Sequence, residues 1–316
     1  MHVVGIGFFA DVAELVDASG LGPGTREGVE VRVLSSALGE VLGGKSAGHY
    51  SGLVTTIEDT RTSVPPSLEV IKKLPDKDQG KPPVLFVHGL GHGAWCWHNW
   101  LEFVAGAGYP AYAVSLRGHG QSAGSLLGSH LGHYVDDVIR TATSLSRQPV
   151  IVGHSLGGLV VQRAIARYPA KAAVLVAPVP ARPGAGPLAL IARHHPADAA
   201  KILLGGSLPL RYDYLFKGLD RVEADRYLEL CGKESALAQF QVLLHKPSPP
   251  PLGKAPVLVM GTPDDRLIPL SDLRDTARRY SAPLLEFPGI GHDLMLDEGW
   301  QRPAVAMVEW FDDELS

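Results

Sequence analysis

The sequence predicts an α/β fold in which helices cover both faces of a mostly parallel sheet and a helical cap is inserted late in the chain. Short runs rich in β-branched residues alternate with stretches of helical character, which is typical of a parallel sheet buried on both faces. This alternation lapses over residues 179–246 and then resumes, which indicates an insertion.

The composition limits the class of protein. The chain has 316 residues, of which 45% are hydrophobic, and this suffices for one large domain or for one domain with an insertion. Lysine and arginine total 29 against 33 acidic residues, which gives a formal net charge of −4, and there is no long basic run. A nucleic-acid partner is therefore not expected.

Cysteine content and hydropathy bear on the compartment. Cys96 and Cys231 are too few for a disulfide framework and lie outside metal-binding spacings, so both are expected to be buried thiols. The N-terminal residues lack a basic region, and Asp11 and Glu14 interrupt their apolar run, which is untypical of a signal peptide. Because no 18 apolar residues run together, we expect no integral membrane association and a cytoplasmic location.

Residues 1–50 are predicted to form an N-terminal extension. The stretch 10–37 has weak periodicity and a glycine-rich turn, and more glycine and serine follow it. It also resembles the peptide obtained when a transfer-RNA gene is translated. The extension is therefore expected to be disordered or to reflect a start site assigned too far upstream.

The predicted core comprises residues 51–178 and 247–316. Two early strands are expected within 52–60 and 67–74, separated by the turn signal "VPPS". Further strands are predicted from apolar, β-branched runs at 83–89, 110–116, 149–155, 172–178, 255–261 and 282–289.

Helices are expected between these strands. Apolar residues recur at spacings of three and four in the stretch 130–146, which gives a crossover helix one face that can pack on the sheet; they are Leu131, Val135, Val138, Ala142 and Leu145. Helices are also expected at 273–280 and 303–315. Within the cap, 179–246, the stretches 186–206 and 220–244 are predicted to be helical.

One polar residue interrupts an apolar run at the heart of this pattern. Ser155 lies in Gly153-His154-Ser155-Leu156-Gly157, a Gly-x-Ser-x-Gly sequence, after a predicted strand and before a predicted helix. A sharp turn there needs small residues two positions away on each side and exposes the serine at the sheet edge. The pattern therefore predicts a nucleophile rather than a glycine-rich turn with an incidental serine.

A serine hydroxyl needs a base and a group that orients the base. Asp264 and Asp265 follow the predicted strand at 255–261, and His292 follows the next one. The order Ser, Asp, His, each beyond a different strand of one sheet, is the chain order typical of the Gly-x-Ser-x-Gly hydrolases.

From about Pro83 to the C-terminus the chain resembles α/β-hydrolase-fold serine hydrolases. The motifs that carry the resemblance are "HGLGHGAWCW" (88–97), "LRGHGQS" (116–122), "GHSLGGLVVQ" (153–162) and "GHDLMLDEGW" (291–300). They resemble the bacterial lysophospholipase-like branch, and the first also resembles plant methylesterases and hydroxynitrile lyases.

The resemblance implies that Ser155 is the nucleophile, Asp265 the acid and His292 the base, with residues 179–246 as a cap over the site. Asp265 is preferred to Asp264 because the typical pattern places a proline four residues after the acid, and Pro269 fits.

Stabilisation of a tetrahedral intermediate requires hydrogen-bond donors aimed at its oxyanion, and fixed backbone amides serve this purpose. The amide of Leu156 follows the nucleophile, and the amide of Leu90 occupies the matching position in the loop after an early strand. Several histidines lie in the same motifs, but no carboxylate or cysteine joins them at ligand spacing, so no metal and no cofactor are expected.

The expected activity is hydrolysis of carboxylic esters through an acyl-enzyme on Ser155. Apolar stretches in the cap favour an apolar acyl or alkyl group. The alternatives are a hydroxynitrile lyase or perhydrolase on the same fold, or a ligand-binding protein on this scaffold. The natural substrate, the acyl length, the choice among esterase, lipase, thioesterase and amidase, and the oligomeric state stay open.

Overall fold

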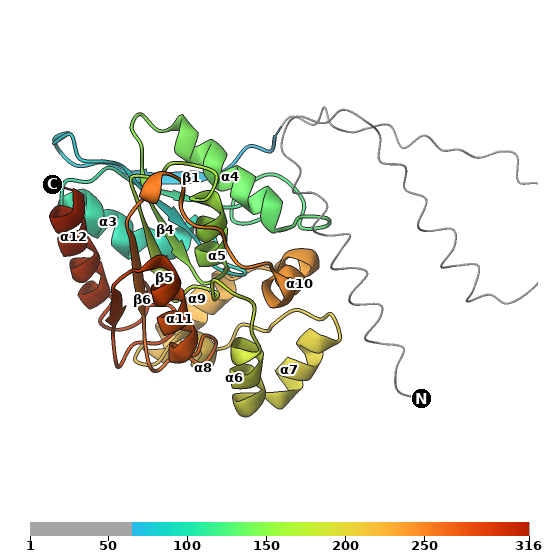
Figure 1. The fold of residues 1–316 in the computed structure, drawn as a ribbon. Coiled ribbons are helices and arrows are strands. Elements are labelled where there is room, and N and C mark those ends of the chain that lie inside the picture. The colour runs from blue at the N-terminus through green and yellow to red at the C-terminus, as the bar shows by residue number, and fades with distance from the viewer. Residues whose placement is uncertain (1–64, 316) are drawn as a thin grey trace, which may run out of the picture. The chain divides into compact units, whose positions relative to one another are not determined.

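A seven-stranded sheet forms the centre of the computed structural model, which describes residues 65–315 (Figure 1). The strand order is β1-β3-β2-β4-β5-β6-β7, and every neighbouring pair is parallel except β1 with β3. The strands are β1 (Val70–Lys73), β2 (Val84–Val87), β3 (Ala111–Val114), β4 (Val150–His154), β5 (Ala172–Val176), β6 (Val257–Gly261) and β7 (Leu284–Glu286). The predicted α/β fold class with a mostly parallel sheet is confirmed.

Two predictions lie outside the described residues: the N-terminal extension over 1–50 and the strand expected within 52–60. The chain divides into two units at Pro65, and the sheet and its helices belong to the second unit, Pro66–Ser316. The other early strand, expected within 67–74, is β1.

The parallel strands end at one edge of the sheet because their registers are aligned. Val84 of β2 pairs with Val150 of β4, and His154 at the end of β4 pairs with Val176 at the end of β5. Loops that follow these strands therefore emerge side by side. This edge is where ligands bind in open α/β sheets.

Helices cover both faces of the sheet (Figure 1). On one side lie α3 (His98–Gly106) and α12 (Gln301–Leu315), and on the other lie α4 (Leu131–Ser144) and α5 (Leu156–Ala164). The helix α11 (Leu270–Tyr280) packs on β6. The predicted apolar face of α4 is buried at four of its five positions, and Leu145, just past the helix, is half-buried.

Tryptophans fill the space between the sheet and α3. Trp97 and Trp100 are fully buried, with ring centroids 4.8 and 6.3 Å from that of Phe86 on β2. Trp97 belongs to a short 3₁₀ helix, η2 (Ala94–Trp97), that leads into α3. These two side chains hold the element after β2 in place, and with it the loop that precedes η2.

The segment between β5 and β6 is helical but more broken than the sequence predicts. It contains α6 (Gly186–His194), α7 (Pro196–Leu203), α8 (Tyr212–Leu215), α9 (Arg221–Leu230) and α10 (Ala236–Leu244), followed by a 3₁₀ turn, η3 (Leu252–Lys254). The stretch 186–206 splits at His195, because Pro196 disfavours a helical conformation for the residue before it. The stretch 220–244 splits at 231–235, where Ser235 caps the next helix.

No helix within residues 65–315 is both long and apolar enough to cross a membrane.

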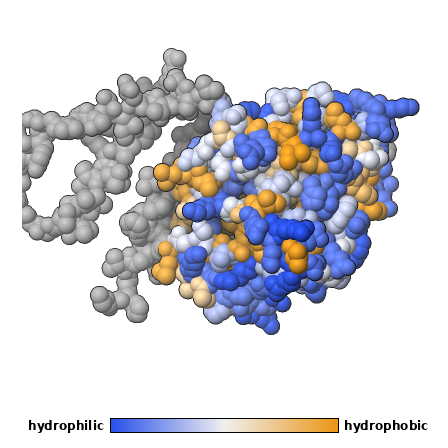
Figure 2. Space-filling view, turned by 180° about the vertical axis from the view of Figure 1, so that it is seen from behind, coloured by the Kyte–Doolittle hydropathy of each residue, from blue (hydrophilic) through white to orange (hydrophobic). Residues whose placement is uncertain are grey.

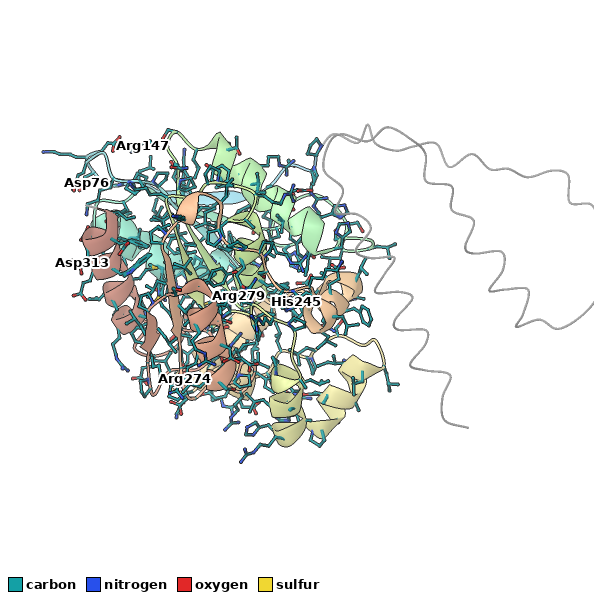
Figure 3. The ribbon with its side chains drawn as sticks, viewed as in Figure 1. Asp76, Arg147, His245, Arg274, Arg279 and Asp313 are labelled. Carbon is teal, nitrogen blue, oxygen red and sulfur yellow. The ribbon has the colours of Figure 1, made fainter. Side chains whose placement is uncertain are left out.

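Figure 3 places the labelled Asp76, Arg147 and Asp313 at the end of the molecule away from α6 and α7. Arg147 precedes β4, so that end carries the starts of the strands, and the helical segment lies toward the opposite edge.

Candidate active site

Ser155 sits on a sharp turn between β4 and α5. Its backbone adopts φ 51° and ψ −116°, a conformation that costs a non-glycine residue energy and persists only where surrounding structure imposes it. The flanking glycines allow that turn: a Cβ at Gly157 would lie 2.6 Å from the carbonyl oxygen of Val87, and one at Gly153 would lie 2.6 Å from a Val161 methyl. The expected strand-turn-helix context of Ser155 is present.

Two loops bring an acid and a base together. Asp265 follows β6 and His292 follows β7, and Nδ1 of His292 lies 2.7 Å from Oδ2 of Asp265. Both side chains are buried. The other carboxylate oxygen, Oδ1, accepts hydrogen bonds from the amides of Leu267 and Ile268 at 2.7 and 2.9 Å, which fixes the carboxylate.

The two adjacent aspartates are used differently. Asp264 forms an ion pair with Lys217 and accepts a hydrogen bond from the amide of Gly289, and the hydrogen bond from Lys217 lowers the pKa of that carboxyl. Only Asp265 contacts His292. The structure therefore brings Asp265 to the histidine. Asp264 instead joins the segment between β5 and β6, called the cap segment below, to the loop after β7.

The protonation of His292 follows from its partner. Asp265 accepts at Nδ1, so the hydrogen resides there and Nε2 is left as the base. Burial by itself lowers the pKa of His292, but the charge and hydrogen bond of Asp265 outweigh it, and the net pKa is raised. The imidazolium formed when this base takes a proton is thus stabilised.

The two predicted oxyanion amides belong to two different elements. Leu156 begins α5, where backbone N–H groups have no helical partner, and Leu90 lies in the loop after β2. In the described part of the chain, neither amide donates a hydrogen bond to another residue. Gly89 allows the loop to approach, since a Cβ there would lie 3.1 Å from that of Ser155.

Hydrogen bonds hold the loop after β2 from several sides. Nδ1 of His88 donates to the carbonyl of Gly89 at 2.8 Å, and its Nε2 accepts from the amide of Leu116 at 3.0 Å. This arrangement fits a neutral ring, and burial keeps the pKa of His88 well below its ordinary value. His88 therefore ties the loop after β2 to the backbone at Leu116.

The cap segment contacts the same loop. The amide of Gly232 donates to the carbonyl of Gly91 at 2.7 Å. Glu234, which is buried, accepts from the hydroxyl of Tyr134 at 2.6 Å and from the amide of Gly91 at 3.4 Å. Residues between α9 and α10 therefore fasten the loop that carries Leu90.

Asp293 is a buried residue of the site to which the sequence analysis assigned no role. Its Oδ2 lies 3.0 Å from Nε2 of His92, and its Oδ1 lies 3.5 Å from Nε2 of His154. That nitrogen of His154 donates to the carbonyl of His292 at 3.1 Å, and burial lowers the pKa of His154 to about 3, so the ring is neutral. The position of Asp293 directly after the predicted base was the available signal.

This cluster is the one place in residues 65–315 where three groups could share a metal ion: His154, His292 and Asp293. Hydrogen bonds already occupy Nε2 of His154 and Nδ1 of His292, while Asp293 accepts from His92. The three side chains therefore belong to one hydrogen-bonded network, which also includes His92 and Asp265.

Asp297 is a second buried carboxylate that the sequence interpretation missed. Its two oxygens accept hydrogen bonds from five backbone amides, those of Lys217, Gly218, Leu219, Gly291 and Glu298. Three of these amides belong to the cap segment, and one directly precedes His292. Asp297 thus joins the cap segment to the loop of the predicted base.

An apolar cavity of about 90 Å³ opens beside Ser155 and His292. Aliphatic side chains from the cap segment and from the loop after β6 line most of it, among them Leu188, Ile191, Ile202, Val242 and Leu267. None of the residues that line it is lysine, arginine, aspartate or glutamate. A neutral, apolar group suits this cavity.

Comparison with known proteins gives a family and a set of relatives. Residues 84–309 match the sequence profile described as "Alpha/beta hydrolase family". The rice protein "Probable esterase PIR7A" (Oryza sativa subsp. indica) is 36% identical over 115 residues, which are 34% of this chain and 43% of the relative. "Methylesterase 3" of Arabidopsis thaliana is 34% identical over 104 residues, 32% of this chain and 40% of the relative.

The matched part thus spans less than half the length of these curated relatives, and the resemblance to plant methylesterases is confirmed. Among solved structures, a monoacylglycerol lipase from Paleococcus ferrophilus shares the fold with a TM-score of 0.61 and 24% identity, over 78% of this chain and 99% of that one.

Proposed function

The chain belongs to the alpha/beta hydrolase family, and from that premise we propose that it hydrolyses carboxylic esters with an apolar acyl or alkyl group. One observation carries the proposal: His292, which is hydrogen-bonded to Asp265, and the strained Ser155 border the same apolar cavity. The esterase names of its relatives support it.

The proposed mechanism uses the groups described above. Nε2 of His292 takes the proton of the Ser155 hydroxyl, whose oxygen attacks the ester carbonyl. The amides of Leu90 and Leu156 donate to the oxyanion, and Asp265 stabilises the imidazolium. The imidazolium then protonates the leaving alkoxide. His292 then deprotonates a water molecule, which attacks the acyl carbon of the acyl-enzyme. The bond between that carbon and Oγ of Ser155 breaks as the imidazolium returns the proton to Oγ, and the acid leaves.

The cavity supports hydrolysis over cyanohydrin cleavage. A hydroxynitrile lyase needs a positive side chain near the serine. Neither lysine nor arginine borders the cavity in the described part of the chain, and His92, which does border it, is engaged through both ring nitrogens by Leu90 and Asp293. Ligand binding without catalysis does not require a histidine at the cavity that is oriented by a buried aspartate, as His292 is by Asp265.

The test is hydrolysis of p-nitrophenyl esters from acetate to palmitate by the wild type, by Ser155→Ala and by the control Ser271→Ala, whose hydroxyl lies on the surface helix α11. We expect turnover in the wild type and in the control, and loss of it by at least about 10³-fold in Ser155→Ala. Activity that survives in Ser155→Ala would refute Ser155 as nucleophile. Cyanide release without ester turnover would refute hydrolysis.

The chain-length series also tests a narrower proposal, that the enzyme is lysophospholipase-like. The four motifs support that assignment. The cavity of about 90 Å³ is smaller than the roughly 150 Å³ apolar cavity that holds benzene, which favours a short acyl group instead. An optimum at octanoate or longer would support the lysophospholipase-like assignment, and an optimum at butyrate or shorter would reject it.

We also propose a cytoplasmic location. Cys96 and Cys231 are both unpaired, as is usual in a reducing compartment. Fractionation of cells that express the natural gene tests this, and recovery of the protein outside the cytoplasmic fraction would reject it.

A further inference from the structure

His92 is a buried histidine whose two ring nitrogens both face acceptors. Nδ1 lies 2.8 Å from the carbonyl oxygen of Leu90, and Nε2 lies 3.0 Å from Oδ2 of Asp293. Neither a carbonyl nor a carboxylate can donate a hydrogen bond, so both nitrogens must carry a hydrogen. With Asp293 ionised, this geometry corresponds to the imidazolium form of His92.

The groups around the ring support that charge. Burial alone lowers the pKa of His92, but the charge and hydrogen bond of Asp293 raise it well above its ordinary value. Burial likewise opposes ionisation of Asp293, yet the charge of His92 lowers the pKa of that carboxyl. The pair is thus ionised as a unit.

Among residues 65–315, the side chains that contact the ring of His92 add no second positive charge. The sulfur of Cys231 lies 4.0 Å from Nε2, and its thiol donates to the carbonyl of Tyr227, which leaves sulfur lone pairs toward the ring. The ring of His154, 6.0 Å away, is neutral, and that of Trp95 stacks on His92 at 5.5 Å.

We propose that His92 is a positioning residue for ester hydrolysis: its imidazolium, paired with Asp293, fixes the peptide units that present the Leu90 amide to the oxyanion. The proposal rests on the proposed function. The peptide that carries the Leu90 N–H has the Gly89 carbonyl at its other end, and that carbonyl accepts from the backbone amide of His92 at 3.3 Å. The next carbonyl, that of Leu90, accepts from the His92 ring.

The pair also joins two parts of the catalytic machinery. Asp293 directly follows His292, and His92 lies two residues after Leu90. The contact of His92 with Asp293 therefore sets the oxyanion loop relative to the base. Because a donor preorganised toward the oxyanion acts only when charge develops there, loss of the pair should lower kcat more than it raises KM.

The activity test uses Asp293→Asn and His92→Gln, with His245→Gln as a matched control. His245 is another buried histidine, labelled in Figure 3, and it does not border the cavity. We expect the two site variants to lower kcat by about 10- to 100-fold with KM changed less than about threefold. We expect the control to leave both unchanged. The double variant should lose no more than the worse single variant, since the pair acts as a unit.

A trifluoromethyl ketone with the preferred acyl chain separates positioning from a general loss of structure. Ser155 adds to its carbonyl, His292 takes the serine proton, and the adduct carries an oxyanion. Its affinity should fall by the same factor as kcat in both site variants. A fall in kcat with unchanged ketone affinity, or an unchanged kcat in both folded variants, would overturn the proposal.

Nitrogen NMR of histidine-labelled wild type at pH 8 gives a readout that needs neither activity nor a variant. We expect hydrogens on both Nδ1 and Nε2 of His92, and loss of one of them in Asp293→Asn. A neutral His92 in the wild type would overturn the proposal whatever the activity. Absence of ester turnover with a charged His92 would instead refute the proposed function, on which the positioning role depends.

Discussion

The sheet and the segment between β5 and β6 are built differently, although both border the cavity. Strands β2, β4 and β5 are buried along their whole length. In α9, by contrast, only Ala224 is buried, and Leu204 beyond α7 is 88% exposed. The sheet therefore fixes groups through backbone geometry, whereas the cap segment contributes side chains that can change without loss of the fold.

This contrast leads to a division of roles. Changes at the sheet edge should alter the rate of reaction, changes in the cap segment should alter the choice of substrate, and changes at a residue that joins the two should alter both. The expected effects below run from the largest to the smallest.

Replacement of Asp265 by asparagine should have the largest effect. Asparagine can stabilise the wrong ring tautomer and cannot stabilise the imidazolium, so kcat should fall by about 10³- to 10⁴-fold with a small change in KM. Steady-state kinetics with the preferred p-nitrophenyl ester measures this. Asp264→Asn is the matched control, since that side chain pairs with Lys217 rather than with His292. Equal losses in the two variants would contradict the assignment.

The pH profile tests the same pair. Because the pKa of His292 is raised, the active neutral base forms at a higher pH than for an ordinary histidine, and wild-type kcat/KM should rise with pH through a value above about 6.5. Without the negative charge of Asp265, the residual activity of Asp265→Asn should rise at a lower pH. An unchanged or higher midpoint in the variant would contradict this prediction.

Asp297→Asn should change stability and rate together, because Asp297 joins the two regions. The amide offers one acceptor where the carboxylate accepts five backbone hydrogen bonds, and its NH₂ group would face amides. We expect a loss of about 3 kcal/mol in the free energy of unfolding, measured in urea, and a lower kcat. A stable variant with normal kcat would show that the two regions are independent.

Ile202→Ala should alter substrate choice rather than chemistry. Ile202 is buried on α7 and borders the cavity, so its truncation adds room for about two or three carbons. The optimum in the series of p-nitrophenyl esters should move to longer acyl chains, while kcat for p-nitrophenyl acetate changes less than about threefold. A uniform loss over the whole ester series would place Ile202 among the rate-setting residues.

Leu204→Ser should have the smallest effect. The side chain is almost fully exposed. Figure 2 shows one face of the molecule, on which hydrophobic residues are interspersed with hydrophilic ones. Substitution at an exposed position changes the free energy of unfolding by less than about 0.5 kcal/mol. Kinetics and urea unfolding should match the wild type. A marked change in ester preference would show that the outer surface of the cap segment contacts substrate.

Local pattern accounts for the parts of the fold that the sequence predicted. The buried strands from β2 to β6 are continuous apolar runs, and the buried face of α4 follows the spacing of Leu131, Val135 and Val138. The breaks at His195 and at 231–235 were missed, because one helix was assigned across each stretch although Pro196 and Ser235 are signals for the start of a new helix.

The sequence by itself determined the class of fold and the chain order of serine, aspartate and histidine, since both follow from periodicity and from short motifs. Only the tertiary structure decided which aspartate meets His292, that Asp297 accepts from five amides, and that His92 lies between Asp293 and the carbonyl of Leu90. These facts depend on side chains and backbone groups that are remote in the chain. Their hydrogen bonds form only after the strands have brought several loops to one edge of the sheet.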